Sequence, residues 1–137
     1  YKRYKALAQN EKVVAIGEIG LDYYHNTENK LLQKEVLLEQ MSLADELKKP
    51  IIFHCREAHN DLLEILKNYK PHPNPPLVKG REREGLRGVI HSFSGRWSQA
   101  EQYLEMGFYL GFNGIITFAR DYDKVIKQMP MERLLIE

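Results

Sequence analysis

Residues 50–56 read Pro50-Ile51-Ile52-Phe53-His54-Cys55-Arg56, an apolar run that a proline introduces and a histidine follows. A short apolar run of this kind, rich in β-branched residues, is typical of a strand buried on both faces of a sheet. Four more runs have the same character: Val13-Val14-Ala15-Ile16, Val89-Ile90, Tyr109-Leu110 and Leu134-Leu135-Ile136. The sequence therefore predicts five buried strands.

Stretches with helical spacing separate these runs. The clearest covers residues 31–47 and ends at Lys48-Lys49-Pro50, where cationic residues and a proline suit the end of a helix. Further helices are expected over residues 58–69, 97–106 and 121–128. Because parallel strands need crossover connections, strands that alternate with helices favour a parallel α/β fold, either an open doubly wound sheet or a barrel.

Composition narrows the class of protein. A length of 137 residues favours one domain, and 43% apolar with 28% charged residues excludes a disordered or fibrous chain. A formal charge of +1 gives no overall attraction to nucleic acid or membrane, so any polyanion has to be bound locally. Cys55 is the only cysteine, which excludes an internal disulfide and favours a reducing compartment. No apolar run approaches the roughly 20 residues that span a bilayer, so we expect a soluble, cytoplasmic protein without membrane contact.

One segment breaks the alternation of strands and helices. Four of the six prolines fall within residues 71–85, and proline interrupts both helices and central strands. We therefore expect an exposed, flexible insertion between the second helix and the third strand. Arg81 and Arg83 could contact nucleic acid, but Glu82 and Glu84 offset their charge, so a solvated linker is favoured.

Polar side chains stand where the apolar runs end. Glu18 follows the first run, His54 the second and His91 the third, while Asn113 and Glu137 follow the last two. In parallel β/α folds the C-terminal ends of strands converge on one face, where sites are built. Two histidines and a carboxylate on that face could bind a divalent ion such as Zn²⁺, Mn²⁺ or Mg²⁺.

Each of these residues also has a structural interpretation. A single histidine after a strand is more often a hydrogen-bonded structural residue than a ligand, Asn113 could cap a turn, and Glu137 could be a surface residue. Glu18 is flanked by apolar residues and glycines, where a carboxylate is costly to bury without a partner or a metal. Three more histidines are interpreted as structural or solvated: His25, His59 and His72.

Nucleophilic catalysis is disfavoured. Cys55 stands beside His54, but neighbouring residues on a strand point to opposite faces, so the two cannot form a dyad and Cys55 is interpreted as a core residue. The stretch Ser92-Phe93-Ser94-Gly95 has no glycine two places before either serine. It therefore does not match the nucleophile elbow of serine hydrolases.

Five phrases along the chain closely resemble, in order, the signatures of the TatD family of metal-dependent deoxyribonucleases. They are AIGEIGLDYY (15–24), PIIFHCREA (50–58), GVIHSFSG (88–95), GFYLGFNG (107–114) and RLLIE (133–137). Several phrases in the right order are far more specific than any single motif. The resemblance covers nearly the whole chain apart from the proline-rich segment.

The resemblance implies a TIM-barrel hydrolase whose two divalent ions, Mg²⁺, Mn²⁺ or Zn²⁺, activate water for attack on a phosphodiester of DNA, and the DNA substrate is expected to be single-stranded. Glu18, His54 and His91 would be the metal ligands after the third, fourth and fifth strands of the family's barrel. Arg56, two residues beyond His54, could contact a substrate phosphate or form a structural salt bridge. Three aromatic residues could stack on a base or pack in the core: Tyr23, Tyr24 and Phe93. No obligate protein partner is expected.

Two features of the family are missing from this sequence. The family has a His-x-His pair on its first strand and an aspartate shortly after the position of Glu137, and neither is present here. We therefore expect residues 1–137 to form an incomplete barrel of about five parallel strands that is inactive by itself. A metal-dependent amidohydrolase of a small molecule and a non-catalytic remnant are the alternatives. Many barrel amidohydrolases bridge their metals with a modified lysine at a strand end. No predicted strand of this sequence ends in lysine, which favours the nuclease over the amidohydrolase.

Overall fold

The computed structural model describes residues 2–25, 27–70 and 85–137. Its strands are β1 (Ile16–Asp22), β2 (Ile51–Arg56), β3 (Gly88–Ile90), β4 (Tyr109–Phe112) and β5 (Leu134–Ile136). Its α-helices are α1 (Lys2–Ala8), α2 (Lys30–Leu47), α3 (His59–Asn68), α4 (Trp97–Glu105) and α5 (Asp123–Gln128). Short 3-10 helices follow β4 and precede β5: η1 (Gly114–Thr117), η2 (Arg120–Tyr122) and η3 (Met131–Arg133). From β1 onward, strands and helices alternate as the sequence predicts.

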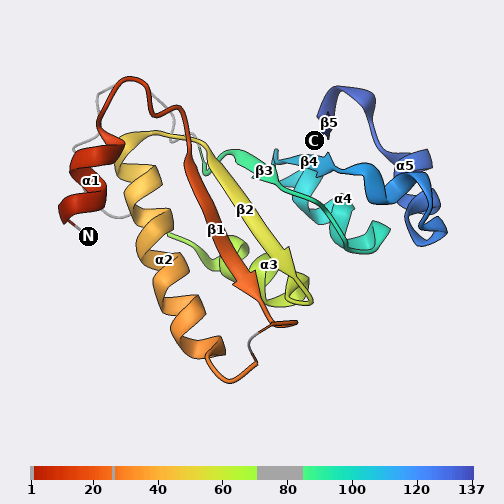
Figure 1. Ribbon diagram of the computed structural model, residues 1–137, viewed down its shortest axis with the longest axis horizontal. Coiled ribbons are helices and arrows are strands. Elements are labelled where there is room, and N and C mark those ends of the chain that lie inside the picture. Colours follow the sequence, from red (N-terminus) through yellow and green to blue (C-terminus); the bar gives the residue numbers. More distant parts are fainter. Residues whose placement is uncertain (1, 26, 71–84) are drawn as a thin grey trace.

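The strands form one parallel sheet in the order β1-β2-β3-β4-β5 (Figure 1). Each strand pairs with the next one along the chain, and the order never reverses. A doubly wound sheet changes direction at a switch point, whereas the strands of a β/α barrel follow one another without reversal. The structure therefore selects the barrel, and the expected incomplete barrel of five parallel strands with alternating helices is confirmed.

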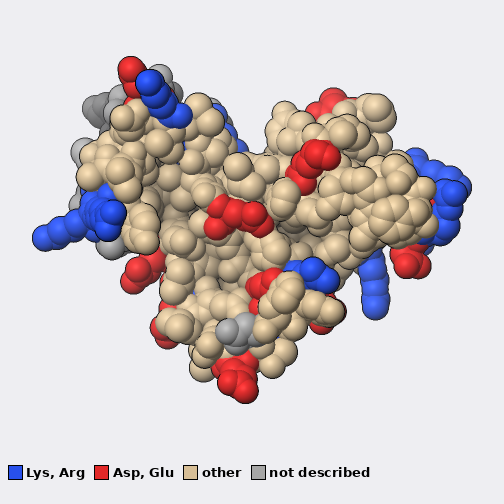
Figure 2. Space-filling view, viewed as in Figure 1, with Lys and Arg blue, Asp and Glu red and all other residues tan. Residues whose placement is uncertain are grey.

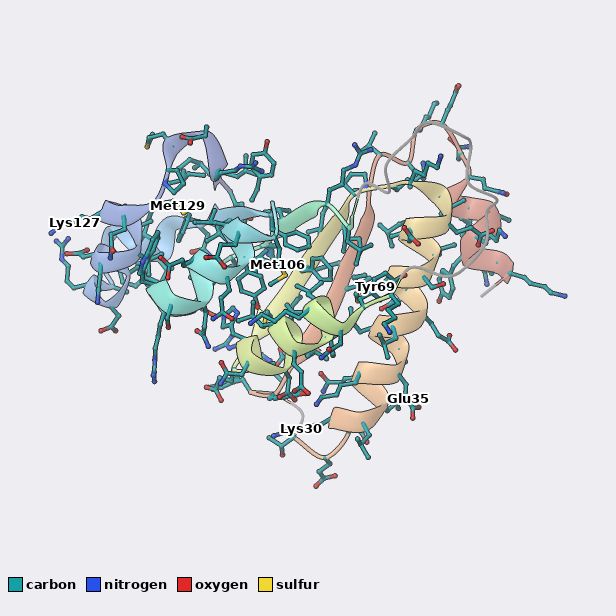
Figure 3. The ribbon with its side chains drawn as sticks, turned by 180° about the vertical axis from the view of Figure 1, so that it is seen from behind. Lys30, Glu35, Tyr69, Met106, Lys127 and Met129 are labelled. Carbon is teal, nitrogen blue, oxygen red and sulfur yellow. The ribbon has the colours of Figure 1, made fainter. Side chains whose placement is uncertain are left out.

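Helices cover one face of this sheet. Seen from behind, α3 lies over β1 and β2, with α2 beside them (Figure 3). The side chains on that face are completely buried and come from several elements: Leu21, Leu37, Met41, Phe53 and Leu110. Each such side chain contributes about 1.5–3 kcal/mol when it leaves water, so this layer supplies most of the driving force for folding.

The other face of the sheet, the side of a barrel's interior, is more open. Ile52 on β2 is 37% exposed, Tyr109 on β4 is 39% exposed, and Leu135 on β5, which pairs with Gly111, is 42% exposed. The prediction of burial on both faces is therefore wrong for these strands. The physical reason is that the described helices all pack on one side, and nothing else in the described residues covers the second side.

Two boundaries differ from the sequence-based expectation. β1 begins only at Ile16, whose N–H donates to the carbonyl of Pro50 at 2.9 Å, because β2 offers no earlier partner. Val14 accordingly lies outside the strand and is 79% exposed. Helix α1 was not predicted, and of its residues only Ala8 is buried.

The predicted insertion at residues 71–85 lies outside the described residues, except for Gly85, which is exposed. Its flexibility therefore stays a prediction. Among the residues that the structure describes, no helix is both long enough and apolar enough to cross a membrane.

Candidate metal centre

Glu18 stands at an irregularity within β1. Gly17 pairs with Ile52 and Ile19 with Phe53, so Glu18 has no partner residue on β2. An extra residue of this kind acts like a β-bulge, which turns a side chain in a new direction. Ile19 is buried under the helices, whereas Glu18 lies on the open face with its side chain 43% exposed. The candidate carboxylate is thus part of the strand and does not follow it.

His54 lies on the same open face as Glu18. Gly20 pairs with His54 across β1 and β2, and a Cβ atom on Gly20 would lie 1.8 Å from the carbonyl oxygen of His54, so only glycine permits this approach. Nδ1 of His54 is 2.8 Å from Oε1 of Glu18. Cys55 points to the buried face, so the predicted absence of a dyad with His54 is confirmed. Burial raises the pKa of the Cys55 thiol to about 12.

His91 directly follows β3 and reaches Glu18 from the other side. Its N–H continues the ladder by donating to the carbonyl of Phe53 at 2.9 Å. Its Nε2 atom is 4.0 Å from Oε2 of Glu18. The two oxygens of Glu18 therefore face two different histidines. Ser92 then adopts a left-handed conformation with φ of 46°, which turns the chain away from the sheet.

Glu137, directly after β5, holds the second nitrogen of His91. Oε2 of Glu137 lies 2.6 Å from Nδ1 of His91 and also accepts the N–H of Ser92 at 3.2 Å. Gly111 on β4 leaves room for this side chain, because a Cβ there would lie 1.8 Å from Oε1 of Glu137. Glu137 is an exposed residue, as its surface interpretation expects, but its side chain is 22% exposed and paired with His91.

Asn113 has a structural role next to the site. Its Oδ1 accepts the N–H of Ile115 at 2.9 Å at the start of η1, and its Nδ2 donates to Oγ of Ser92. The capping interpretation is confirmed.

Asp22 is a contact residue that the reasoning from strand ends missed. Its Oδ2 lies 3.1 Å from Nε2 of His54 and 2.7 Å from Nδ1 of His25. Burial by itself raises the pKa of Asp22, but hydrogen bonds from the backbone and ring of His25 and from His54 outweigh it and hold this pKa well below its usual range. The available signal was spacing: Glu18, Gly20 and Asp22 alternate along one strand and share a face.

The remaining histidines behave as interpreted where the structure describes them. His25 is an exposed partner of Asp22, with its side chain 64% exposed. His59 is buried, 6% exposed, and its Nδ1 lies 3.2 Å from the hydroxyl of Tyr103. Burial lowers the pKa of His59 from 6.5 to about 4. His72 lies outside the described residues.

A cleft of about 950 Å³ opens beside the two histidines, and its walls include His54, His91, Arg56, Ser94 and Arg96. The guanidinium of Arg56 stacks on Tyr24, with Cζ 4.1 Å from the ring centroid. The other aromatic candidates are core residues: Phe93 is 2% exposed, and Tyr23 is 8% exposed and donates to Asp61 at 2.7 Å. Of the three candidate stacking residues, only Tyr24 is available to a ligand.

The donor atoms around Glu18 fit a divalent ion in kind and nearly in spacing. Two donors that each bind an ion at about 2.1 Å are separated by about 3.0–3.4 Å, and the two distances from Glu18 to the histidines, 2.8 Å and 4.0 Å, lie on either side of that range. Among the described residues no group of three His, Cys, Asp or Glu side chains is already spaced around a common ion position.

Comparison with known proteins identifies a family and several relatives. The model of the family "TatD related DNase" matches residues 1–137. An uncharacterized metal-dependent hydrolase of Bacillus subtilis, YabD, is 43% identical over 135 residues, which are 97% of this chain and 48% of that protein. A protein of Klebsiella pneumoniae named 3'-5' ssDNA/RNA exonuclease TatD is 34% identical over 134 residues, 96% of this chain and 46% of that protein.

Solved structures show the same likeness. The crystal structure of YjjV, a TatD homologue from Escherichia coli, superposes with a TM-score of 0.80 at 31% identity and covers 99% of this chain and 49% of that one. A TatD-family hydrolase from Entamoeba histolytica gives a TM-score of 0.78 at 32% identity and covers 99% of this chain and 42% of that one. The chain spans about half the length of the curated relatives it matches.

The fold and the relatives place the chain in a class of proteins named metal-dependent hydrolases and built on a β/α barrel. More particularly, the chain belongs to the TatD family, so the resemblance seen in the sequence is confirmed. The divalent metal use of that class is supported by the names of its relatives.

Proposed function

We propose that this chain carries part of the active centre of a TatD-type deoxyribonuclease, in which Glu18, His54 and His91 bind divalent ions and a phosphodiester of DNA is cleaved. One observation carries the proposal. Glu18 presents one oxygen to His54 at 2.8 Å and the other to His91 at 4.0 Å, although the three residues come from different parts of the sheet. A carboxylate between two imidazoles suits a centre of one or two divalent ions.

The charge of the centre supports a role for cations. Three carboxylates gather around the two imidazoles: Glu18, Asp22 and Glu137. Acidic side chains also lie in the middle of the face shown in Figure 2, whereas most basic ones lie near its outline. Such a surface repels a phosphodiester unless bound cations reverse its charge. Ions bound there would polarise the phosphoryl oxygens and lower the pKa of an attacking water.

Arg56 is the proposed contact for a substrate phosphate. It follows His54 by two residues on β2 and so lies on the same face. The Tyr24 ring holds the guanidinium at the wall of the cleft, where its N–H donors could contact a phosphate. The substrate is proposed to be single-stranded DNA because the relative from K. pneumoniae carries the name of a single-strand exonuclease.

The amidohydrolase alternative has less support. None of the five described strands ends in a lysine that could bridge two metals: their last residues are Asp22, Arg56, Ile90, Phe112 and Ile136. Glu18 stands where such a bridging group would be needed.

The test uses a chimera in which this chain replaces the matching half of the B. subtilis relative, alongside the chain alone. We expect the chimera to cleave labelled single-stranded DNA only when Mg²⁺, Mn²⁺ or Zn²⁺ is added, and Glu18→Gln to reduce the rate by at least about 100-fold. Glu64→Gln is the matched control, because Glu64 is an exposed residue of α3. This variant should leave the rate unchanged. The chain alone is proposed to be inactive, since its sequence has no His-x-His pair.

Other outcomes would redirect the proposal. Hydrolysis of N-acyl amino acids without cleavage of DNA would favour an amidohydrolase. Hydrolysis of neither substrate by a folded chimera would favour a non-catalytic remnant. Cleavage of DNA by the chain alone at the chimera's rate would show that the proposed inactivity is wrong.

A further inference from the structure

Each candidate ligand histidine is held between two carboxylates. His54 turns Nδ1 toward Glu18 at 2.8 Å and Nε2 toward Asp22 at 3.1 Å. His91 turns Nε2 toward Glu18 at 4.0 Å and Nδ1 toward Glu137 at 2.6 Å. Glu18 is common to both pairs, whereas Asp22 and Glu137 each contact one ring from the far side. This arrangement gives the two outer carboxylates a role different from that of Glu18.

Asp22 is fixed in place before any ligand binds. Its Oδ1 accepts the N–H groups of Tyr24 at 3.0 Å and His25 at 2.9 Å. Its backbone is held by Gln33, whose Oε1 accepts the Asp22 N–H at 2.8 Å and whose Nε2 donates to the Asp22 carbonyl at 3.0 Å. The carboxylate therefore cannot rotate freely, and Oδ2 is the oxygen that faces the imidazoles.

We propose that Asp22 is the positioning residue for His54. A carboxylate only accepts hydrogen bonds, so Asp22 holds a proton on Nε2 of His54, whereas a cation bound by Glu18 would replace the proton on the Nδ1 side. Nδ1, which faces Glu18, then keeps its lone pair for a cation. This inference rests on the proposed function, since it takes His54 to be a metal ligand. A carboxylate behind a metal-binding histidine fixes both the tautomer and the orientation of the ring.

The substitution Asp22→Asn separates this role from a local structural one. Oδ1 of asparagine can still accept the two N–H groups of Tyr24 and His25, so the turn after β1 keeps its backbone hydrogen bonds, and only the contact of Oδ2 with the exposed ring of His25 changes. The amide NH₂ then replaces Oδ2 and donates to Nε2 of His54. The proton of His54 is driven to Nδ1, the nitrogen that would otherwise face the cation, while the shape of the side chain hardly changes.

The experiment measures Zn²⁺ affinity of the purified chain by isothermal titration calorimetry. We expect Asp22→Asn to weaken Zn²⁺ binding about 10- to 100-fold. Asp61→Asn is the matched control: it makes the same change at a carboxylate whose partners are Tyr23 and Lys34, and Zn²⁺ affinity should not change. Unchanged affinity of Asp22→Asn, or an equal loss in both variants, would overturn the positioning role.

Two further measurements keep the inference separate from the proposed function. If Glu18→Gln leaves Zn²⁺ affinity unchanged, the metal centre itself is wrong. If Glu18→Gln weakens binding and Asp22→Asn does not, only the role of Asp22 is wrong. Long-range ¹H–¹⁵N correlation on the unmodified Zn²⁺-bound chain gives a readout that needs no variant: Nδ1 of His54 should be metal-bound and Nε2 protonated, and the reverse assignment contradicts the proposal.

Discussion

His59 shows what burial does to a single ionisable residue. It lies at the start of α3, 6% exposed, against Tyr103 and Phe93, and its Nε2 has no hydrogen-bond partner among the described residues. The charged form is therefore disfavoured, and its pKa falls from 6.5 to about 4. Between these two values the unfolded chain binds a proton at this residue and the folded chain does not.

This difference predicts a pH dependence of stability. Because the unfolded state binds more protons between pH 6.5 and about 4, the free energy of unfolding falls as the pH falls, by about 1.4 kcal/mol per pH unit from this residue. Between pH 6.5 and pH 5 the free energy of unfolding should fall in both proteins. We expect this fall to be about 2 kcal/mol smaller in His59→Gln than in the unmodified chain, as measured by urea unfolding. Equal losses in both proteins would show that His59 is not the source.

Gly20 is the residue whose size matters most to the centre. A Cβ at this position would meet the carbonyl oxygen of His54 at 1.8 Å, so β1 and β2 would have to separate. We expect Gly20→Ala to lower the free energy of unfolding by about 1–3 kcal/mol and to weaken Zn²⁺ binding. Gly114→Ala is the control, because a Cβ there meets no atom within 4 Å. Similar thermal unfolding of the two variants would contradict this.

The ligand candidates could be found from the sequence, but the contacts that Asp22 and Glu137 make with them could not. His91 directly follows a short apolar run and His54 lies near the end of another, and position along a strand fixes the face of the sheet. Asp22 and Glu137 contact the histidines through particular rotamers and through space left by Gly20 and Gly111. Such contacts depend on the register between strands, which apolar runs do not reveal.

At the scale of elements, α2 divides its residues sharply between the sheet and solvent. Leu37 is completely buried against the sheet, whereas Leu31 on the same helix is 78% exposed. We expect Leu37→Ala to lower the free energy of unfolding by about 2–5 kcal/mol, since it leaves a cavity under β1. Leu31→Ala should change it by less than about 0.5 kcal/mol, as typical of surface substitutions. Chemical denaturation of the two variants, made in parallel, checks this, and equal effects would argue against the packing described for α2.

The elements from β1 onward followed from periodicity, whereas helix α1, the start of β1 and the irregularity at Glu18 did not. The helices after β1, β2, β3 and β4 were expected because their apolar residues recur at helical spacing. The start of β1 was misplaced because a strand extends only as far as its neighbour can pair, and that limit lies in β2. The irregularity at Glu18 has no signature in the apolar pattern and so could not be predicted.

At the scale of the whole molecule, the sheet has two outer strands. Within the described residues β1 pairs only with β2, and β5 pairs only with β4. Unpaired strand edges and exposed apolar side chains promote association. Ile136 on β5 combines both features, being 77% exposed on an outer strand.

We therefore expect the chain alone to self-associate at micromolar concentration. Ile136→Lys should shift it toward monomer, because an edge charge opposes strand pairing between molecules. Leu31→Lys is the control, because Leu31 is 78% exposed on α2 and lies away from the sheet edges. This variant should leave the degree of association unchanged. Size-exclusion chromatography with light scattering measures the outcome, and a chain that stays monomeric without either substitution would contradict this expectation.

The distribution of Glu18, His54 and His91 over three strands also sets the order of events in time. The crossovers that contain α2 and α3 must both close before the three side chains meet, so a cation can stabilise only a state in which the β1, β2 and β3 segments have already assembled. Interactions that form after the transition state slow unfolding and leave the folding rate unchanged. A bound ion would thus stabilise the chain only after its strands have assembled. Its effect would be seen as a lower unfolding rate and not as a higher folding rate.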